Sequence, residues 1–314
     1  MPNQSDLRKQ ITAKIVDAIE SKHLLPWRRP WSSSKSGGRH CNVNRRAYSG
    51  INPLMCELHS MAHGLNSNVW GTFAQWKALG LNVMKRPPYI QPGEWGLNLV
   101  FYKPVKTTNI DSETGEQVDD QFLLMRSFTV FNADQVEGEG VEQFRPVPQV
   151  VTEFSTDYGP AKELLQATGA KIDHWGEEAF YRRPLPEDTW PNHTSGDDIV
   201  LPPKSSFAST GKYYETAFHE LAHYSEVRLG WDHHQHGYAM GELVAEISAS
   251  LLSAEVGVPQ GESLENHAAY LKTWLDGMKC DSSFIFRAST QASKVTDYLL
   301  SFVRAEEPAE SMAV

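Results

Sequence analysis

Residues 213–226 of the 314-residue chain read YYETAFHELAHYSE, and this stretch decides how the rest of the sequence is interpreted. It contains His219-Glu220-x-x-His223 on a background of apolar residues, without proline or glycine. On a helix, residues four apart lie on the same face, so both imidazoles can hold one metal ion. The Glu220 carboxylate can then reach a water at the metal. The alternative is an amphipathic helix with two solvated histidines, which the apolar residues around the motif disfavour.

A second carboxylate pair follows in residues 241–252, which read GELVAEISASLL. Glu242 and Glu246 share one face of the predicted helix among apolar neighbours, and an unpaired buried carboxylate is costly. The pair resembles the Glu-x-x-x-carboxylate pattern of gluzincin metallopeptidases, in which the first residue binds the metal and the other orients a ligand imidazole. The resemblance implies that Glu242 is the third ligand and Glu246 its supporting partner. The reverse assignment also fits the spacing.

The loop from residue 230 to residue 238 holds three further histidines, His233, His234 and His236. Their spacing does not match the extended motif in which a third histidine binds the metal. We expect solvated loop histidines, with an additional metal ligand as the alternative.

Two histidines and a carboxylate predict a divalent ion, and Zn²⁺ is the expected one, although Mn²⁺ accepts the same donors. A bound ion would lower the pKa of water, and Glu220 would remove its proton for attack on an amide carbonyl. The predicted chemistry is therefore that of a metallopeptidase. A structural or vestigial metal site is the alternative.

The net charge of −10 conceals an asymmetry between two halves of the chain. Residues 1–106 carry 15 Lys and Arg against 5 Asp and Glu, whereas residues 107–314 carry 14 against 34. Such a division favours two domains with different partners. A basic, aromatic-rich first domain suits nucleic acid, although a merely solvated positive face would give the same charge.

Tryptophans and tyrosines alternate with arginines in the first domain, the pattern that single-stranded DNA requires, because exposed bases stack on rings while cations neutralise phosphates. In duplex DNA those base faces are hidden. Buried core tryptophans are the alternative. The predicted DNA contacts are Trp27, Arg28, Arg29, Trp31, Arg39, Asn44, Arg45, Arg46, Tyr48, Lys85 and Arg86.

The residue pattern predicts an α+β fold with two domains, residues 1–135 and 151–314, joined by a linker at residues 136–150. In the first domain we expect helices at residues 6–21, 53–63 and 74–79, and strands at 97–105 and 122–132 with a polar tip between them. In the second we expect helices at 157–168, 262–278 and 283–303, and strands at 169–172, 178–181 and 197–202. The last strand resembles the edge strand that metallopeptidases place above the metal.

No apolar run reaches the roughly 18 residues that cross a bilayer, and the first residues lack the apolar core of a signal peptide. Cys41, Cys56 and Cys280 have neither metal nor redox spacing. These features predict a cytoplasmic protein with free thiols and no membrane partner.

Two sets of residues resemble one known family, in its order. Pro26-Trp27-x-x-Pro30-Trp31, Asn44-x-x-x-Tyr48-x-Gly50-Ile51-Asn52, Trp70-x-Thr72-x-x-Gln75 and Phe131-Asn132-x-x-Gln135 resemble the N-terminal domain of ArdC-type antirestriction proteins, and a similar domain occurs in TraC-type primases. Tyr270-x-x-x-Trp274-Leu275, Phe286-Arg287-Ala288, Ala292 and Asp297-Tyr298 resemble that family's metallopeptidase-like domain. Residues 85–93 depart from the family's Gly-rich basic turn.

The resemblance implies a protein of conjugative plasmids that binds entering single-stranded DNA and protects it from host restriction, by blocking or cleaving restriction factors. It leaves two alternatives. The first is a DNA-binding shield whose metal site is structural or vestigial. The second is an accessory to priming or transfer of plasmid DNA.

Overall fold

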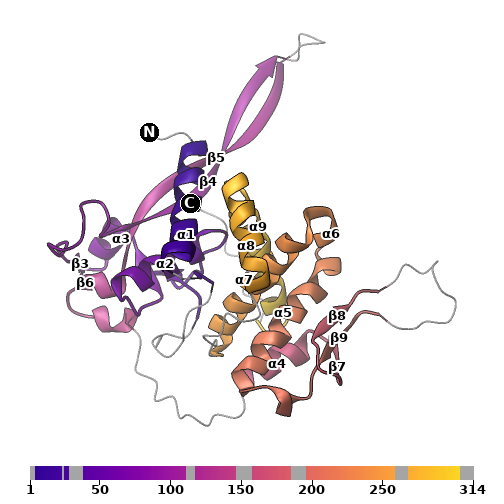
Figure 1. The fold of residues 1–314 in the computed structure, drawn as a ribbon. Coiled ribbons are helices and arrows are strands. Elements are labelled where there is room, and N and C mark those ends of the chain that lie inside the picture. The colour runs from indigo at the N-terminus through magenta and orange to yellow at the C-terminus, as the bar shows by residue number, and fades with distance from the viewer. Residues whose placement is uncertain are drawn as a thin grey trace.

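The computed structural model describes residues 4–22, 25–27, 38–110, 117–145, 158–184, 196–258 and 268–304. Residues 22, 106–110, 117–122 and 268–269 are described by their backbone alone. Figure 1 shows the N-terminal half (residues 4–145), coloured indigo to pink, beside the C-terminal half (residues 158–304), coloured rose through orange to yellow. The α+β class predicted from the sequence is confirmed.

The N-terminal half combines helices with a four-stranded sheet. Its helices are α1 (Gln4–Lys22), α2 (Asn52–His63) and α3 (Phe73–Ala78). The sheet has the order β1-β2-β5-β4, formed by Cys41–Asn42, Val69–Gly71, Gln117–Asn132 and Leu97–Ile110. A small antiparallel sheet pairs β3 (Asn82–Val83) with β6 (Val136–Glu137), and Ala133–Gln135 and Val141–Phe144 are short 3-10 helices.

Local signals explain where these helices begin and end. Pro53 lies in the first turn of α2, and Gly64 ends that helix with a left-handed φ of 66°. Thr72 and Gln75 form a capping box at the start of α3, each side chain binding the other residue's backbone N–H.

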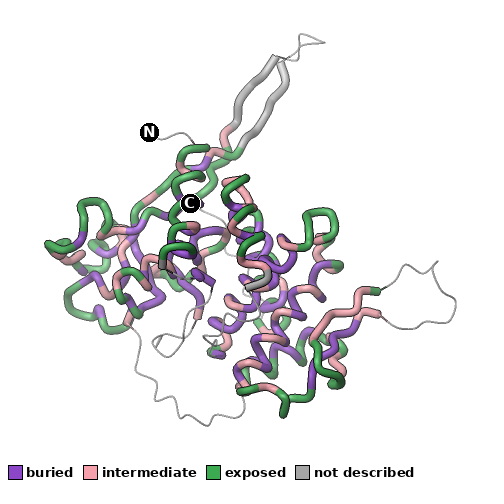
Figure 2. The backbone as a smooth tube through the Cα atoms, in the orientation of Figure 1, coloured by how far each residue is buried: buried purple, intermediate pink, exposed green. Residues whose placement is uncertain are grey.

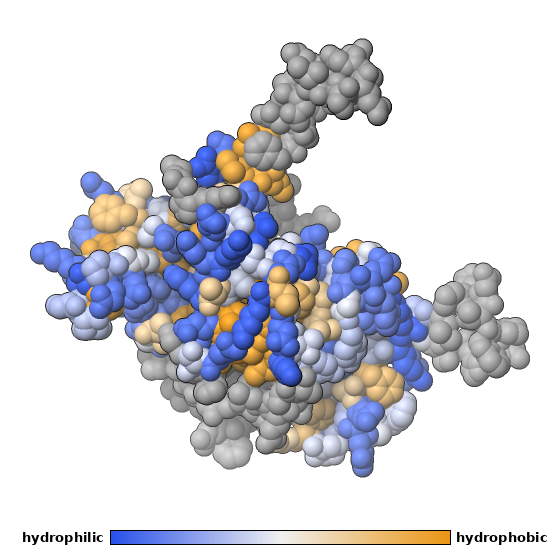
Figure 3. Space-filling view, turned by 45° about the horizontal axis from the view of Figure 1, so that its top comes forward, coloured by the Kyte–Doolittle hydropathy of each residue, from blue (hydrophilic) through white to orange (hydrophobic). Residues whose placement is uncertain are grey.

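Strands β4 and β5 form a long antiparallel hairpin that leaves the body of the protein (Figure 1). Their pairing continues to Ile110 and Gln117, beyond the predicted strand ends at residues 105 and 122. Phe101 and Leu123, in the described part of the hairpin, are 44% and 57% exposed. In Figure 3 one area of hydrophobic colour lies where the hairpin meets the body, and another lies near the middle of the visible face.

The C-terminal half packs helices against a three-stranded sheet. The strands β7 (Lys171–His174), β9 (Asp198–Leu201) and β8 (Phe180–Arg182) lie in the order β7-β9-β8. The helices are α4 (Gly159–Ala167), α5 (Thr210–Arg228), α6 (His233–His236), α7 (Tyr238–Val256), α8 (Ala268–Cys280) and α9 (Phe284–Ser301), with a 3-10 turn at Lys204–Ser206. Helix α7 packs against both α5 and α9 at the centre of this half.

The prediction that residues 197–202 form an edge strand is wrong, because β9 is the central strand. It pairs parallel with β7 on one side and antiparallel with β8 on the other. All four residues of β9 are buried, as expected for a strand covered on both sides. Strand β8 lies at an edge of this sheet instead.

The two halves share one hydrophobic core. Trp27 packs edge-on against Trp274 of α8, with ring centroids 5.8 Å apart. The hydroxyl of Thr12 on α1 donates a 2.8 Å hydrogen bond to the carbonyl of Ser282. Figure 2 shows buried backbone running through the helices between the two halves.

The first part of the predicted linker is packed rather than free. Residues 136–137 form β6, and Val141 and Phe144 are buried, with the Phe144 ring 5.2 Å from that of Trp76. The N-terminal half therefore extends to at least Arg145. Residues 146–150 of the predicted linker lie outside the described residues.

The three cysteines are free thiols, two of them buried. Among the described residues, no helix has both the length and the apolar character needed to cross a membrane.

Candidate metal centre

Helix α5 carries the first two donors and is fixed locally by its sequence. The side chain of Ser209 accepts a hydrogen bond from the Lys212 N–H and caps the helix start. Phe218 and Leu221 are fully buried, and His219 and His223 lie on the opposite side of the helix, where His219 lines the cavity beside α7.

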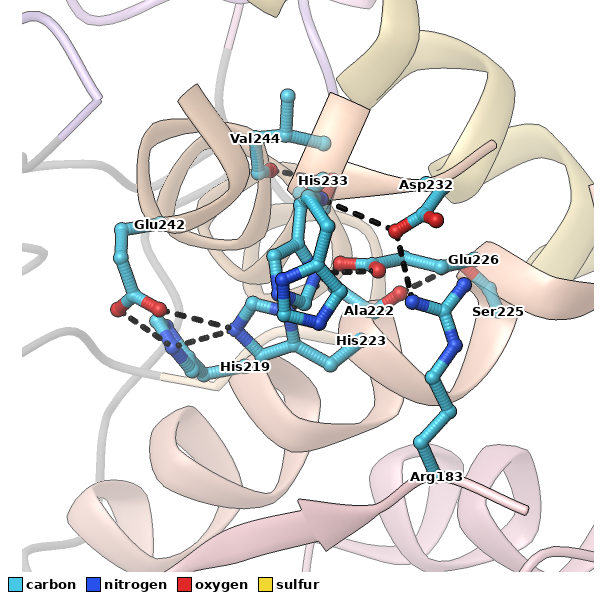
Figure 4. Close-up of polar contacts among 12 residues, drawn as sticks. Arg183, His219, Ala222, His223, Ser225, Glu226, Asp232, His233, Glu242 and Val244 are labelled. Carbon is cyan, nitrogen blue, oxygen red and sulfur yellow. Dashed lines mark hydrogen bonds and ion pairs between the residues drawn. The ribbon is translucent and has the colours of Figure 1, made fainter. Parts of the chain in front are cut away.

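Three side chains converge at one point (Figure 4). The Nε2 atoms of His219 and His223 lie 3.2 Å apart. The Glu242 carboxylate of α7 faces both, with Oε2 3.5 Å from His219 Nε2 and Oε1 3.5 Å from His223 Nε2. One ligand atom from each residue lies within 4.8 Å of the others. Two imidazole nitrogens and a carboxylate suit a divalent ion of the zinc type.

A further carboxylate contacts the Nδ1 atom of each imidazole, on the side of the ring away from the centre. Glu246 Oε1 lies 3.0 Å from His219 Nδ1, and Glu226 Oε1 lies 2.8 Å from His223 Nδ1. A carboxylate at Nδ1 favours a proton on that nitrogen and leaves Nε2 free to bind a metal. The structure thus separates the two glutamates of α7: Glu242 faces the centre and Glu246 lies behind His219.

Sequence reasoning missed the role of Glu226 and of His233. The second carboxylate oxygen of Glu226 lies 2.6 Å from His233 Nδ1, so Glu226 bridges two histidines. A side chain on Gly241 would place its Cβ 2.6 Å from that of His233, so this glycine allows α6 to approach α7. Glu226 lies three residues after His223, a helical spacing that could have revealed the pair. His234 and His236 are exposed, as expected.

Contacts of Asp232 also fix the position of α6. Asp232 caps the helix by accepting the His234 N–H, and its carboxylate pairs with the Arg183 guanidinium at 2.7 Å (Figure 4). Arg183 directly follows strand β8, so an edge of the sheet is tied to the histidine cluster.

The neighbouring carboxylates raise the pKa values of His219 and His223, although burial by itself would lower them. Burial alone would lower the pKa of His223, but hydrogen bonds from its ring to Glu226 and Glu242 raise it to about 9. The pKa of His219 is likewise held well above its usual value by Glu242 and Glu246. Burial opposes the ionisation of Glu242, yet the two histidines keep its pKa well below the usual range.

Glu220 lies at the wall of a cavity of about 390 Å³ that opens beside the three donors. Its side chain is largely buried, and the cavity is also lined by Trp27 of the N-terminal half and Tyr270 of α8. The hydroxyl of Tyr270 is 3.2 Å from that of Tyr238. The cavity therefore places the Glu220 carboxylate and the Tyr270 hydroxyl near the three converging side chains.

The predicted DNA contacts do not form a comparable cluster. Tyr48 is half-buried, and five residues are exposed: Asn44, Arg45, Arg46, Lys85 and Arg86. The Arg45 guanidinium donates to the carbonyl of Gln143 and lies over the Phe144 ring. Arg28, Arg29 and Trp31 lie outside the described residues.

The burial of Trp27 and Arg39 contradicts the prediction that these two residues contact DNA. Trp27 is 1% exposed and packs on Trp274, so its ring offers almost no surface on which a base could stack. The side chain of Arg39 is 3% exposed, and its guanidinium binds Glu255 at 3.3 Å and Asp297 at 2.9 Å. Both residues join the N-terminal half to the C-terminal helices.

The fold and the site define a zincin-like domain behind an α+β N-terminal domain. Residues 160–291 match the family model of a zincin-like metallopeptidase, and residues 5–131 match that of the N-terminal domain of anti-restriction factor ArdC. The metal-free crystal structure of antirestriction protein ArdC from plasmid R388 is 31% identical, with a TM-score of 0.71, and the match covers 95% of this chain and 97% of that one. The chain belongs to the ArdC antirestriction family.

Other relatives extend this comparison. The Mn(II)-bound structure of R388 ArdC, also 31% identical, has a TM-score of 0.68 over 95% of this chain and 98% of that one. An uncharacterised protein of Sinorhizobium fredii is 28% identical over 94% of this chain and 92% of its own length. Two DNA primases TraC of Escherichia coli are 28% and 30% identical over 96% and 94% of this chain, which spans only 20% and 27% of their lengths.

Proposed function

We propose that this protein binds single-stranded plasmid DNA entering the cytoplasm and protects it from host restriction with the help of a metallopeptidase site. The observation that carries the enzymatic part is the convergence of His219, His223 and Glu242 beside Glu220. A purely structural metal would not need a general base and an open cavity next to its ligands. Family membership supports the antirestriction role.

In this proposal His219, His223 and Glu242 hold the ion, with Glu246 and Glu226 orienting the two imidazoles. Zinc is the expected ion, and manganese suits the same donors, as the Mn(II)-bound ArdC relative illustrates. When bound, the ion supplies a Lewis acid that acidifies water and polarises a carbonyl.

The side chains of the chain itself perform the proton transfers. Glu220 accepts a proton from water in the cavity as the water attacks a peptide carbonyl, and then passes that proton to the leaving amine. The hydroxyls of Tyr238 and Tyr270 can donate hydrogen bonds to the oxygen on which negative charge develops. The peptide substrate would be a restriction factor of the recipient cell.

In this proposal the basic N-terminal half of the chain binds the DNA. Arg45, Arg46, Lys85 and Arg86 are exposed and can reach phosphates, and the half-buried Tyr48 can contact a base. We also propose Arg28, Arg29 and Trp31 as DNA contacts on sequence grounds, because they continue the alternation of cations and rings.

A direct test is conjugative transfer of an unmodified plasmid into a restricting recipient, with and without this protein. Transfer into a recipient that lacks the restriction enzyme is the control. The proposal expects more transconjugants only in the restricting recipient. Equal yields with and without the protein would contradict it.

A second candidate is support of priming or transfer, favoured by the TraC primases that share this region. It predicts that the protein raises transfer equally into restricting and non-restricting recipients. The same experiment therefore separates the two functions.

A further inference from the structure

A second groove lies where the two halves of the chain meet. It has a volume of about 470 Å³ and shares no lining residue with the cavity at the metal centre. Its walls come from α1, β4, α7, α9 and the segment around α6. They include Arg8, Tyr102, Trp231, His236, Phe286 and Lys294.

This groove is basic although the half that supplies most of it is acidic. Its charged lining residues are Arg8, Arg287 and Lys294, and none of the lining residues carries a carboxylate. Arg287 is paired with Asp281 at 2.7 Å. Among the described residues, by contrast, neither Arg8 nor Lys294 has a hydrogen bond or an ion pair, and Arg8 Nε is buried without a partner. A buried guanidinium nitrogen without an acceptor is costly, which points to an anionic ligand.

Flat aromatic faces lie beside these cations. The rings of Trp231 and His236 are stacked, with centroids 5.3 Å apart and planes at 9°. Tyr102 is 43% exposed at the base of the hairpin. The Arg8 guanidinium lies 5.7 Å from the centroid of the Phe286 ring. Rings next to unpaired cations match the two parts of a nucleotide, a base that stacks and a phosphate that needs neutralisation.

We propose that this groove is a second contact for single-stranded DNA, holding about one nucleotide between the two halves, a size within the usual range for small-ligand pockets. Arg8 and Lys294 bind the phosphate, and Tyr102 with the Trp231–His236 pair provides the stacking surface. The strand held by the N-terminal half thus reaches the helices of the metallopeptidase-like half. This inference rests on the proposed DNA binding and adds a specific second site to it.

The test measures binding of the full chain to a fluorescein-labelled oligothymidylate of about 20 nucleotides by anisotropy, over a range of salt concentrations. The double variant Arg8→Ala, Lys294→Ala loses two phosphate contacts. We expect the slope of log affinity against log salt to fall in magnitude by about 1.4, since each contact to a single strand contributes about 0.7. Tyr102→Ala should weaken binding about tenfold.

Two variants guard against indirect effects. Lys294→Glu alone changes only an exposed side chain, so it should fold normally and still weaken binding. Lys272→Ala on α8 removes an equally exposed cation outside the groove and should leave affinity and slope unchanged.

Three results would overturn the inference. If the double variant Arg8→Ala, Lys294→Ala and the variant Lys294→Glu both keep the wild-type slope of log affinity against log salt, the strand does not reach the groove. The proposed DNA binding would still stand. Full competition by inorganic phosphate would reduce the groove to a simple anion site. Absence of binding by the wild-type protein would contradict the proposed DNA binding itself, and the groove with it.

Discussion

Two helices of this protein carry histidine pairs at the same spacing, His59 and His63 on α2 and His219 and His223 on α5. The ring centroids are 4.3 Å apart in the first pair and 5.0 Å in the second. The pairs nevertheless have opposite protonation behaviour. Burial lowers the pKa of His59 to about 4, whereas the carboxylates around His223 raise its pKa to about 9.

The difference lies in what surrounds each pair rather than in its helix. His219 and His223 face Glu242 and are supported by Glu246 and Glu226. The α2 pair lies near the rings of Trp70 and Trp95. Among the described residues, the groups of side chains suited to a metal include the α5 pair and not the α2 pair. Two histidines at helical spacing therefore form a candidate metal site when other elements bring further donors to them, as α7 brings Glu242 here.

The largest effect on metal binding is expected when the carboxylate at the centre is removed. Glu242→Ala should lower metal affinity by more than the roughly 10–100-fold that loss of a supporting carboxylate costs, because a ligand itself is lost. Isothermal titration with Zn²⁺ and Mn²⁺ measures this effect. As a matched control, His59→Ala with His63→Ala should leave one ion bound per chain. Unchanged metal affinity in Glu242→Ala would show that the site is elsewhere.

A smaller effect is expected when a supporting carboxylate is neutralised. Glu226→Gln keeps the shape of the side chain but weakens its hold on His223 and His233, so metal affinity should fall about 10–100-fold. Glu163→Gln, on the exposed surface of α4, is the control and should have no effect. If both variants bind metal equally well, the Glu226 bridge does not position His223.

The α2 pair gives a prediction of acid sensitivity. The pKa of His59 is about 4 in the folded protein, below its ordinary 6.5, so the unfolded chain binds the proton first. The stability that His59 contributes is fully present above pH 6.5 and is lost as the pH falls toward 4. The loss should be about 1–3 kcal/mol. Urea unfolding of wild type and of His59→Gln at several pH values measures the difference, and parallel curves would refute it.

The smallest effect concerns the DNA-binding surface of the N-terminal half. Arg45→Ala with Arg46→Ala removes two exposed cations, so binding of single-stranded DNA should weaken several-fold and its salt slope should fall by about 1.4. Metal affinity should not change, because neither residue contacts the metal centre. A loss of metal binding together with DNA binding would mean that the two halves do not carry separate functions.

The sequence predicted most of the side chains that converge at the candidate centre, because their spacing along each helix is local. The spacing of His219 and His223 follows from one helix, and that of Glu242 and Glu246 from another. Only the packing of α7 on α5 shows which glutamate faces the centre. The bridge from Glu226 to His233 could not be foreseen, since it depends on how closely Gly241 lets α6 approach α7.

The DNA surface and the sheet were less predictable, because both depend on contacts distant in sequence. Trp27 and Arg39 suit DNA by type, yet both bind helices more than 200 residues away. In the three-stranded sheet of the C-terminal half, β9 lies between β7 and β8, which both precede it in the sequence. An apolar run alone does not reveal this order. Residues 136–145 lack periodicity and still pack, because β6 pairs with β3.

In the proposed function, Glu220 acts at the metal centre in the protection of DNA. The most direct measurement is the conjugation assay with Glu220→Gln, after showing that this variant folds and binds metal and single-stranded DNA like the wild type. We expect this variant to lose the protection of unmodified DNA in a restricting recipient. Full protection by that variant would contradict a peptidase role and would mean that the protein is a DNA-binding shield with a structural metal.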